Sequence, residues 1–286
     1  MKTRIVLTLI AVAALAGCGG GSSSEGQRPT VVAAFYPLAF AAEQIGGGGI
    51  GVRNLTPPGV EPHDLELSGS DIRTISEAGV VFYLGGGFQP ALEDAIAATS
   101  ARAVDVLEAV ETKEGGEEEQ AVDPHVWLDP VRYAAIAERI GAELQRLPEA
   151  ERFATRLRAL DREFRHGLSR CERDEIVTSH AAFGYLAGRY GLKQVAITGV
   201  SPEADPTPRD LENVVREVRA AGATTVFFET LVSSRLAETV AREVGATTAV
   251  LDPLEGLTEK EIAAGENYFS VMREDLAALR KALGCR

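Results

Sequence analysis

The sequence has few of the side chains that most often carry chemistry. Among 286 residues there are four histidines, three cysteines and one tryptophan, and aromatic residues make up 6%. The chain contains neither an H-E-x-x-H helix nor a G-x-S-x-G turn, so two common hydrolase signatures are absent. Function is therefore expected where the few histidines are placed.

The chain also lacks the excess of positive charge that nucleic-acid binding requires. Its formal net charge is −13 at pH 7. A protein that contacts phosphate backbones needs a basic face. The acidic balance argues against a nucleic-acid partner and is compatible with a cation as cargo.

Long apolar runs are missing after the first residues, and the first run is too short to span a bilayer. Lys2 and Arg4 precede the apolar stretch 5–16, and Leu15-Ala16-Gly17-Cys18 resembles a bacterial lipobox. The sequence predicts a lipoprotein signal peptide over 1–17 and lipid attachment at Cys18. The alternative is an ordinary secretory signal with an incidental cysteine.

Residues 18–29 are rich in glycine and serine and predict a flexible tether behind the lipid. Two or more acyl chains hold a soluble domain at a membrane surface without a spanning helix. The expected location is the extracytoplasmic face of the cell membrane, with the protein anchored through Cys18.

Two cysteines remain once Cys18 is assigned to lipid. Cys171 and Cys285 form an even pair in a chain predicted to be exported, which predicts a disulfide between them. The alternative is two free thiols.

Short apolar strands alternate with amphipathic helices along the rest of the chain. Such alternation predicts an α/β fold with parallel sheets covered by helices. The predicted strands cover 31–35, 52–55, 80–84, 103–106, 175–178, 194–198, 224–228 and 247–251, and the last helix is expected to run from about 258 to 283. The predicted organisation is an N-terminal lobe over 30–147 and a C-terminal lobe of the same architecture over 172–286.

A long charged helix is predicted between the two lobes, over 148–171. Apolar residues recur at three- and four-residue spacing and form a single stripe; they are Phe153, Leu157, Leu160, Phe164 and Leu168. A long helix with α/β segments on both sides is expected to act as a rigid strut, so we expect the lobes to move little relative to each other. His166 lies on this helix and is expected to be exposed to solvent.

Three histidines occupy loops next to predicted strands. His63 follows the second strand, His125 lies between two prolines in V-D-P-H-V-W-L-D-P, and His180 follows the strand 175–178. Prolines stiffen the loops that carry His63 and His125. Because ligands of α/β sheets bind beyond the carboxyl ends of the strands, all three imidazoles are candidates for one site.

Three neutral imidazoles and one carboxylate make a four-coordinate site typical of Zn²⁺. The positive end of the helix after His180 is expected to keep the imidazole ring of His180 neutral. Two carboxylates that end strands of the second lobe, Asp252 and Glu229, are candidates for the fourth ligand, and spacing favours Asp252 only slightly.

Over nearly all of residues 30–283 the chain resembles the zinc- and manganese-specific substrate-binding lipoproteins of bacterial ABC importers. The matching stretches include P-P-G-V-E-P-H-D-L-E-L, D-P-H-V-W-L-D-P, T-S-H-A-A-F-G-Y-L-A and L-D-P-L-E-G-L. The resemblance implies two lobes joined by a long helix with one metal between them. It places the ligands on His63, His125, His180 and Asp252, with Glu229 as a nearby acid that could substitute.

Two departures from the family pattern bear on the metal. The segment 111–120 is acidic and has no histidine, where many zinc-specific relatives carry a histidine-rich loop; a solvated linker is expected there. Manganese-selective relatives tend to have a carboxylate at the position of His180, so imidazole favours zinc over manganese.

The sequence thus predicts a monomeric, non-enzymatic receptor that captures Zn²⁺ and delivers it to an ABC permease and its ATPase. Three alternatives stay open. The first is the same role for Mn²⁺, the second a zinc hydrolase or lyase with an open coordination position and Glu61 or Glu229 as base. The third is a surface adhesin, which no repeat or large apolar stretch supports.

Overall fold

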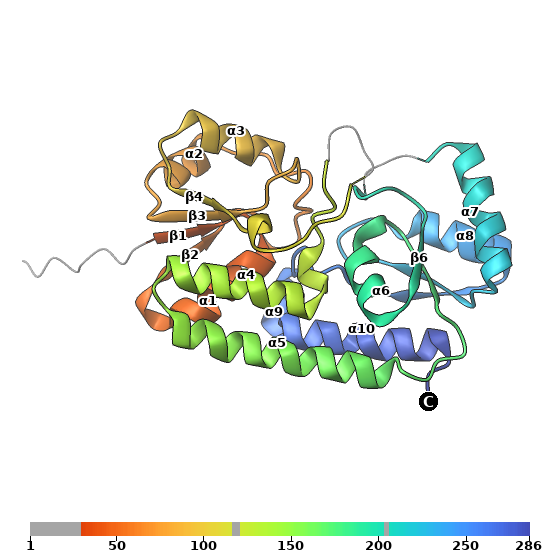
Figure 1. The fold of residues 1–286 in the computed structure, drawn as a ribbon. Coiled ribbons are helices and arrows are strands. Elements are labelled where there is room, and N and C mark those ends of the chain that lie inside the picture. The colour runs from red at the N-terminus through yellow and green to blue at the C-terminus, as the bar shows by residue number, and fades with distance from the viewer. Residues whose placement is uncertain (1–29, 116–120, 203–205) are drawn as a thin grey trace, which may run out of the picture.

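The computed structural model describes residues 30–115, 121–202 and 206–286. The predicted signal peptide, Cys18 and the glycine-serine tether lie outside these residues, as does part of the acidic segment 111–120. Within them the chain forms two lobes, each built on a parallel four-stranded sheet, above a pair of long helices (Figure 1).

The first lobe has the strand order β2-β1-β3-β4, with every neighbouring pair parallel. Its strands are β1 (Thr30–Ala33), β2 (Gly51–Asn54), β3 (Val80–Tyr83) and β4 (Ala103–Asp105). Its helices are α1 (Tyr36–Gly46), α2 (Gly69–Ser76), α3 (Pro90–Ala98) and α4 (Pro130–Glu143), with 3₁₀ turns η1 (Gly47–Gly49), η2 (Val106–Ala109) and η3 (Val126–Leu128).

The second lobe repeats this arrangement with the order β6-β5-β7-β8, again all parallel. Its strands are β5 (Glu175–Thr178), β6 (Lys193–Ala196), β7 (Thr225–Phe228) and β8 (Thr247–Val250). The turn η4 (Ala181–Phe183) and the helices α6 (Gly184–Tyr190), α7 (Pro208–Ala221) and α8 (Arg235–Val244) connect them. In each lobe the first strand pairs with both the second and the third, which confirms the predicted pseudo-symmetric α/β architecture.

Two long helices, α5 (Leu147–Gly167) and α10 (Tyr268–Leu283), run side by side beneath both lobes (Figure 1). The predicted apolar stripe of α5 is buried, from Phe153 to Phe164. The helix ends at Gly167, four residues before the predicted end at 171. His166 lies in its last turn and is exposed, as expected.

The predicted helix over 258–283 is wrong, because the chain forms two helices there. The first, α9 (Glu259–Ala264), ends where Gly265 adopts a left-handed conformation with φ of 84°. Asn267 then begins α10, and its side chain accepts a hydrogen bond from the Phe269 N–H. A glycine that ends one helix followed by an asparagine that begins the next marks such a break.

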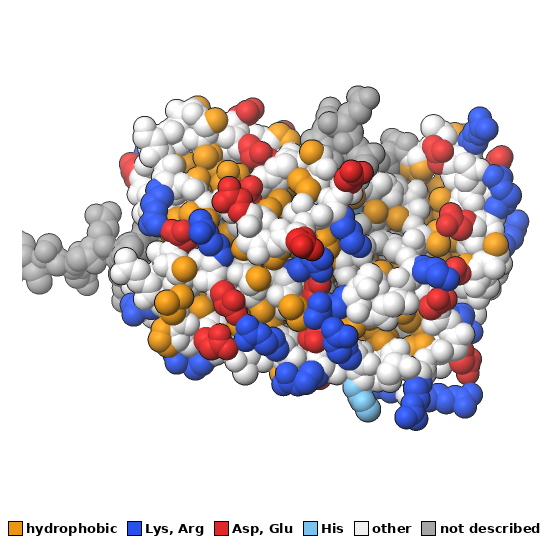
Figure 2. All heavy atoms as spheres, in the orientation of Figure 1, with side chains coloured by type: hydrophobic (Ala, Val, Ile, Leu, Met, Phe, Trp, Pro, Cys, Tyr) orange, Lys and Arg blue, Asp and Glu red, His pale blue; other side chains and the backbone are white. Residues whose placement is uncertain are grey.

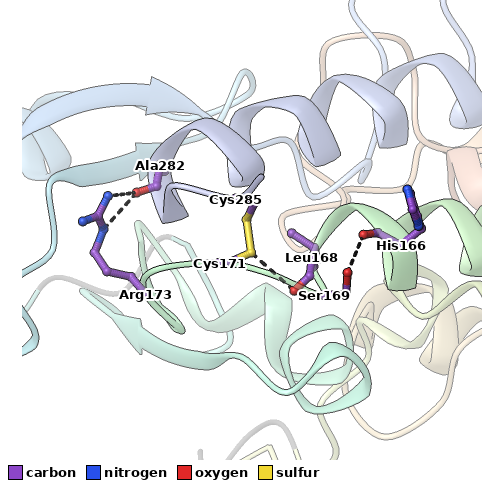
Figure 3. Close-up of a disulfide and its surroundings, with 7 residues drawn as sticks. All are labelled: His166, Leu168, Ser169, Cys171, Arg173, Ala282 and Cys285. Atoms are coloured by element: carbon purple, nitrogen blue, oxygen red, sulfur yellow. Dashed lines mark hydrogen bonds between the residues drawn. A yellow bond between two sulfur atoms is a disulfide. The ribbon is translucent and has the colours of Figure 1, made fainter.

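The predicted disulfide between Cys171 and Cys285 is present (Figure 3). It joins the segment after α5 to the three residues that follow α10, across 114 positions of sequence. Beside it the Arg173 guanidinium donates hydrogen bonds to the Ala282 carbonyl at 3.1 and 3.2 Å. The disulfide therefore fastens together the same ends of the two long helices.

The surface carries charges of both signs. In the face shown in Figure 2, acidic and basic side chains are interspersed, and Lys and Arg side chains gather along the lower edge, over α5. Among the described residues no helix has the length and apolar character needed to cross a bilayer.

Candidate metal centre

Four side chains from both lobes converge on one point between them. They are His63, His125, His180 and Glu255, and one ligand atom from each lies within 4.8 Å of the others. His63 lies in the loop after β2, His125 directly before η3, His180 directly after β5, and Glu255 in the loop after β8. The structure thus brings together the three histidines that the sequence singled out.

The four donor atoms are closely spaced. Glu255 Oε1 lies 3.0 Å from His125 Nε2, 3.3 Å from His180 Nε2 and 3.5 Å from His63 Nε2. The two Nε2 atoms of His125 and His180 are 3.2 Å apart. All of these atoms are shielded from solvent, because the side chains of His125, His180 and Glu255 are 0% exposed and that of His63 is 5% exposed.

The loop that carries His125 is fixed by its neighbours in sequence. The Asp123 carboxylate accepts a hydrogen bond from the His125 backbone N–H at 3.0 Å. Asp129 begins α4, accepting from the Val131 N–H at 2.9 Å. Trp127, between them, is buried and donates its indole N–H to the Pro253 carbonyl of the other lobe at 2.7 Å. The two aspartates and the tryptophan therefore hold the histidine in place.

Carboxylates set the orientation of two imidazole rings. Asp123 Oδ1 lies 2.8 Å from His125 Nδ1, and Glu229 Oε1 lies 2.6 Å from His180 Nδ1. A carboxylate at Nδ1 favours the proton on that nitrogen and leaves the Nε2 lone pair free for a metal. Glu229, the predicted alternative ligand, thus contacts the far side of a histidine ring.

His63 is held differently from the other two histidines. Its backbone N–H donates to Glu61 Oε1 at 3.2 Å, and its ring packs edge-on against Phe88 with centroids 4.7 Å apart. Its Nε2 has no hydrogen-bond partner among the described residues. This nitrogen is buried and free to coordinate an ion.

The charges of the site are coupled. Burial alone would raise the pKa of Glu255, but the charge of His180 and the hydrogen bonds with His125 and His180 outweigh burial and hold that pKa well below its usual value. Burial would lower the pKa of His180, but Glu229 and Glu255 outweigh it and raise that pKa well above its usual value. Asp123 and Glu255 likewise outweigh burial at His125 and raise its pKa. At His63 burial has the largest effect on the pKa and lowers it.

The predicted effect of the helix dipole on His180 omits the two carboxylates that raise the pKa of its ring. The residue is followed by the three-residue turn η4 rather than by a regular first helical turn. Two carboxylates face its ring, and their effect exceeds that of the short turn. A cation that binds here must displace the proton.

Asp252, the predicted fourth ligand, lies outside the cluster. Its carboxylate accepts hydrogen bonds from the Thr230 hydroxyl and the Leu254 N–H, both at 2.7 Å. Burial raises its pKa to about 6. The carboxylate that lies in the histidine cluster is that of Glu255, three residues after Asp252.

A local turn explains why Glu255 was missed. Leu254 has a left-handed backbone with φ of 54°, which is unusual for a residue other than glycine. The turn brings the side chain of Glu255 back over the histidines. The sequence favoured a carboxylate directly at the end of a strand. No general pattern in L-D-P-L-E-G-L predicts a left-handed backbone at Leu254.

Glu61, one of the two bases considered for a hydrolase, is nearly buried beside the cluster. Burial and the neighbouring charge of Glu255 raise its pKa to about 10. A carboxyl group that keeps its proton at neutral pH is a poor general base.

Two α/β lobes joined by a long helix, with a cluster of three histidines and a carboxylate between them, define a two-lobed, metal-binding member of the substrate-binding proteins. The model of the family described as "Zinc-uptake complex component A periplasmic" matches residues 31–282. The chain belongs to this family of substrate-binding transport proteins.

Relatives of known role are similar over most of the chain. The zinc-binding lipoprotein AdcA of Streptococcus pneumoniae serotype 4 is 34% identical over 304 residues, covering 98% of this chain and 60% of the relative. The high-affinity zinc uptake system protein ZnuA of Bacillus subtilis is 33% identical, covering 94% of this chain and 93% of the relative. The chain thus spans about three fifths of the streptococcal relative and nearly all of the Bacillus one.

Solved structures agree with this assignment. The Zn(II)-bound ZnuA-like domain of Streptococcus pneumoniae AdcA matches with a TM-score of 0.76 and 34% identity, covering 90% of this chain and 99% of that one. The laminin binding protein Lmb of Streptococcus agalactiae, described as having adhesin and metal transporting activity, matches with a TM-score of 0.80 and 27% identity, covering 89% and 99%.

Proposed function

We propose that this protein captures Zn²⁺ between its lobes, with His63, His125, His180 and Glu255 as ligands, and delivers it to an ABC permease and its ATPase. The observation that carries this proposal is the spacing of the donor atoms. In a tetrahedral zinc site with bonds of about 2.0–2.1 Å, ligand atoms lie roughly 3.3–3.4 Å apart. Four separations in this cluster lie between 3.0 and 3.5 Å.

The donor set supports zinc over manganese, the alternative cargo. Imidazole nitrogens suit zinc, and the affinity order places Mn²⁺ below Zn²⁺ for such ligands. Relatives named for zinc binding and zinc uptake point the same way.

The same donor set supports capture over catalysis. Three histidines and a carboxylate occupy four positions, whereas a catalytic zinc keeps one position for water or substrate. The adhesin activity described for Lmb belongs to that relative.

The ligand assignment is tested by a matched pair of variants. Glu255→Gln and Asp252→Asn each remove one buried carboxylate charge, three residues apart. Removing one partner of a buried charged set costs about 3–5 kcal/mol, so we expect Glu255→Gln to weaken zinc binding roughly 100-fold or more. Asp252→Asn is expected to change it less than about tenfold, measured by competition with a chelator. Equal losses, or a larger loss for Asp252→Asn, would refute Glu255 as the ligand.

The membrane attachment and delivery role extend this proposal beyond the described residues. We propose lipid attachment at Cys18, a monomeric extracytoplasmic protein, and lobes over 30–147 and 172–286 linked by the segment that contains α5 (Leu147–Gly167). Cys18→Ala is expected to release the protein from membranes while leaving zinc affinity unchanged, as followed by fractionation. Uptake of isotopic zinc by cells carrying Glu255→Gln is expected to fall to the level of cells that lack the protein.

A further inference from the structure

A tyrosine of the second lobe lies between that lobe and the loop that carries His125. Tyr185 is on α6, which follows η4 and therefore comes soon after His180 in the chain. Its side chain is buried, and two cationic groups of the first lobe lie over its ring. The Arg132 guanidinium is 5.0 Å and the Lys113 ammonium 5.2 Å from the ring centroid. Tyr185 thus contacts both lobes beside the metal centre.

The Tyr185 hydroxyl is inserted into a backbone pairing of the first lobe. Glu114 and Val122 form an antiparallel bridge, next to which the Asp123 N–H donates to the Lys113 carbonyl at 3.0 Å. In a regular antiparallel pair the two residues exchange a second hydrogen bond. Here the Lys113 N–H donates to the Tyr185 hydroxyl at 2.7 Å instead, and that hydroxyl donates to the Asp123 carbonyl at 2.8 Å. The hydroxyl therefore takes the place of one backbone hydrogen bond.

Asp123 connects this pairing to a proposed zinc ligand. Its Oδ1 accepts the His125 backbone N–H at 3.0 Å and lies 2.8 Å from His125 Nδ1. The carboxylate extends from the same residue whose carbonyl accepts from Tyr185. A group that fixes the backbone of Asp123 therefore also fixes the position from which its carboxylate reaches the imidazole.

The other end of the His125 loop is held by the same helix. Arg189 lies one turn after Tyr185 on α6, so the two side chains share a face of the helix. The Arg189 Nε atom is 3.1 Å from Asp129 Oδ1 and 2.7 Å from Asp161 Oδ1. Asp129 begins α4 directly after the loop. The loop is thus fastened to α6 before and after His125.

Two glycines of α6 allow the first lobe to approach it closely. A Cβ atom added at Gly184 would lie 3.1 Å from Asp123 Oδ2, which is closer than an ordinary van der Waals contact. A Cβ atom added at Gly188 would lie 3.3 Å from Lys113 Nζ, the end of a flexible side chain. The missing side chain at Gly184 therefore lets the Asp123 carboxylate lie against the helix.

We propose that Tyr185 is a positioning residue of the metal centre. Its hydroxyl fixes Asp123, and Asp123 orients His125 toward the point at which His180 of the other lobe also converges. The effect on zinc affinity rests on the proposed zinc function, whereas the effect on the His125 loop stands on the contacts alone.

The proposal is tested by Tyr185→Phe, with Tyr133→Phe as the matched control. Each variant removes a buried hydroxyl that donates to a backbone carbonyl. The Tyr133 hydroxyl donates to the Pro37 carbonyl at 2.5 Å, within the first lobe. Loss of a group that orients a metal ligand lowers metal affinity about 10–100-fold, so we expect Tyr185→Phe, which acts through Asp123, to lower zinc affinity roughly tenfold. Tyr133→Phe is expected to retain wild-type affinity in the same chelator competition. Equal affinities of the two variants would overturn the proposal.

A double-mutant cycle with Asp123→Ala separates positioning from general destabilisation. If Tyr185 acts through the Asp123 carboxylate, Tyr185→Phe has little left to change once that carboxylate is removed. We therefore expect zinc affinity to be nearly the same in Asp123→Ala with and without Tyr185→Phe. An undiminished loss in the Asp123→Ala background would overturn the proposal, because it would show that Tyr185 acts by another route.

Hydrogen exchange of the metal-free protein tests the loop without reference to zinc. In Tyr185→Phe the backbone amides of peptides spanning 122–128 are expected to exchange several-fold faster, and in Tyr133→Phe to exchange at the wild-type rate. Equal rates in the two variants would overturn the proposal. If wild-type protein failed to bind zinc, the proposed function would be refuted, and hydrogen exchange would still decide whether Tyr185 fixes the loop.

The glycine pair keeps the proposal falsifiable if Tyr185→Phe fails to fold. Gly184→Ala removes no hydrogen-bonding group but displaces the Asp123 carboxylate, so zinc affinity is expected to fall about threefold. Gly188→Ala is expected to leave zinc affinity unchanged, because the Lys113 side chain can move aside. Unchanged zinc affinity in Gly184→Ala would overturn the proposal.

Discussion

Two bodies of buried apolar side chains hold the molecule together, and they differ in extent. The larger, here called the shared core, includes β1 and β3, the helices α1, α4, α5 and α10, and one face of the second sheet. The smaller, here called the outer cluster, lies between the other face of the second sheet and the helices α7 and α8. It consists of Val177, Val195, Ile197, Val218, Val226, Ala237, Val240 and Ala241.

The strands of the second sheet divide their side chains between the two bodies. On β5, Ile176 belongs to the shared core and its neighbour Val177 to the outer cluster; on β7, Phe227 and Val226 divide in the same way. Successive side chains of a strand point to opposite faces, so this division follows from the alternation along each strand.

This difference indicates how the two halves of the metal centre are held in a fixed relative position. A single core connects the first lobe to the inner face of the second, so the halves of the site rest on the same packed interior. The outer cluster has no aromatic residue among its buried members, and none of its members belongs to the metal centre. We therefore predict that α7 and α8 can loosen without disturbing the cluster, and that the lobes move little when metal leaves.

The largest effect is expected from truncating an aromatic residue of the shared core. Phe153 packs against Phe40, Tyr133 and Phe269, with ring centroids 5.7–5.8 Å apart. Phe153→Ala is expected to lower the free energy of unfolding of the metal-free protein by about 3–5 kcal/mol, measured in urea.

The matched variant in the outer cluster is Val240→Ala. It is expected to cost about 2 kcal/mol and to leave zinc affinity unchanged. A clear loss of zinc affinity in Val240→Ala would contradict the distinction between the shared core and the outer cluster.

Removing the disulfide is expected to have the next largest effect. Cys171 and Cys285 close a long loop and join the ends of the two helices that carry the shared core. Cys171→Ser with Cys285→Ser is expected to destabilise the protein by about 2–5 kcal/mol in thermal or urea unfolding. A stability equal to that of the oxidised wild type would show that the helices are held by packing alone.

A smaller effect is expected from the hydrogen bond that crosses between the lobes at the metal centre. Trp127→Phe leaves the buried Pro253 carbonyl without its donor, which costs about 1–3 kcal/mol. Because Pro253 lies two residues before Glu255, zinc affinity is expected to fall about tenfold.

Tyr268→Phe is the comparison for this variant, since the Tyr268 hydroxyl donates to the Trp127 carbonyl at 2.7 Å. It is expected to lower stability with a smaller change in zinc affinity. Unchanged zinc affinity in Trp127→Phe, measured by chelator competition, would show that the hydrogen bond between Trp127 and Pro253 does not support the metal centre.

The smallest effect is expected at the polar edge of the shared core. Asp161 on α5 accepts from Arg189 of α6 at 2.7 Å and from Arg165 at 3.0 Å. Burial alone would raise the pKa of Asp161, but the two arginines outweigh it and hold that pKa below its usual value.

A lowered carboxyl pKa stabilises the folded state above the unfolded pKa, and this contribution is lost as pH falls through the folded pKa. Asp161→Asn is therefore expected to cost about 1–2 kcal/mol at pH 7 and nothing once the wild-type carboxyl is protonated. Glu163→Gln, which removes a solvent-exposed pair with Arg273, is expected to cost at most about 0.5 kcal/mol. A pH-independent cost for Asp161→Asn would contradict this account.

The fold was largely predictable because local signals and the final structure agree. Apolar runs such as the one over 80–84 are short and rich in β-branched and aromatic residues, which favours buried strands, and prolines or glycines separate them from helices. The stripe of α5 predicted its buried face residue by residue. Helix ends were less certain, because Gly265 in a helical pattern can be tolerated or can end the helix, and the Asn267 side chain decides the outcome.

The site was predictable only in part. Histidines are rare here, so their placement in loops after strands or between prolines identified three members of the cluster. The carboxylate depended on a left-handed Leu254, which tertiary packing imposes and local sequence does not announce. The raised pKa of His180 depends on contact with Glu229, which is 49 positions away in sequence.

The most direct test of the account is the coordination of zinc in the loaded protein, read from X-ray absorption on wild type and on Glu255→Gln. The account predicts three nitrogen ligands and one oxygen ligand at about 2.0–2.2 Å in wild type, with the carboxylate oxygen lost or replaced by water in the variant. An identical spectrum for Glu255→Gln, with the carboxylate oxygen lost instead in Asp252→Asn, would contradict it.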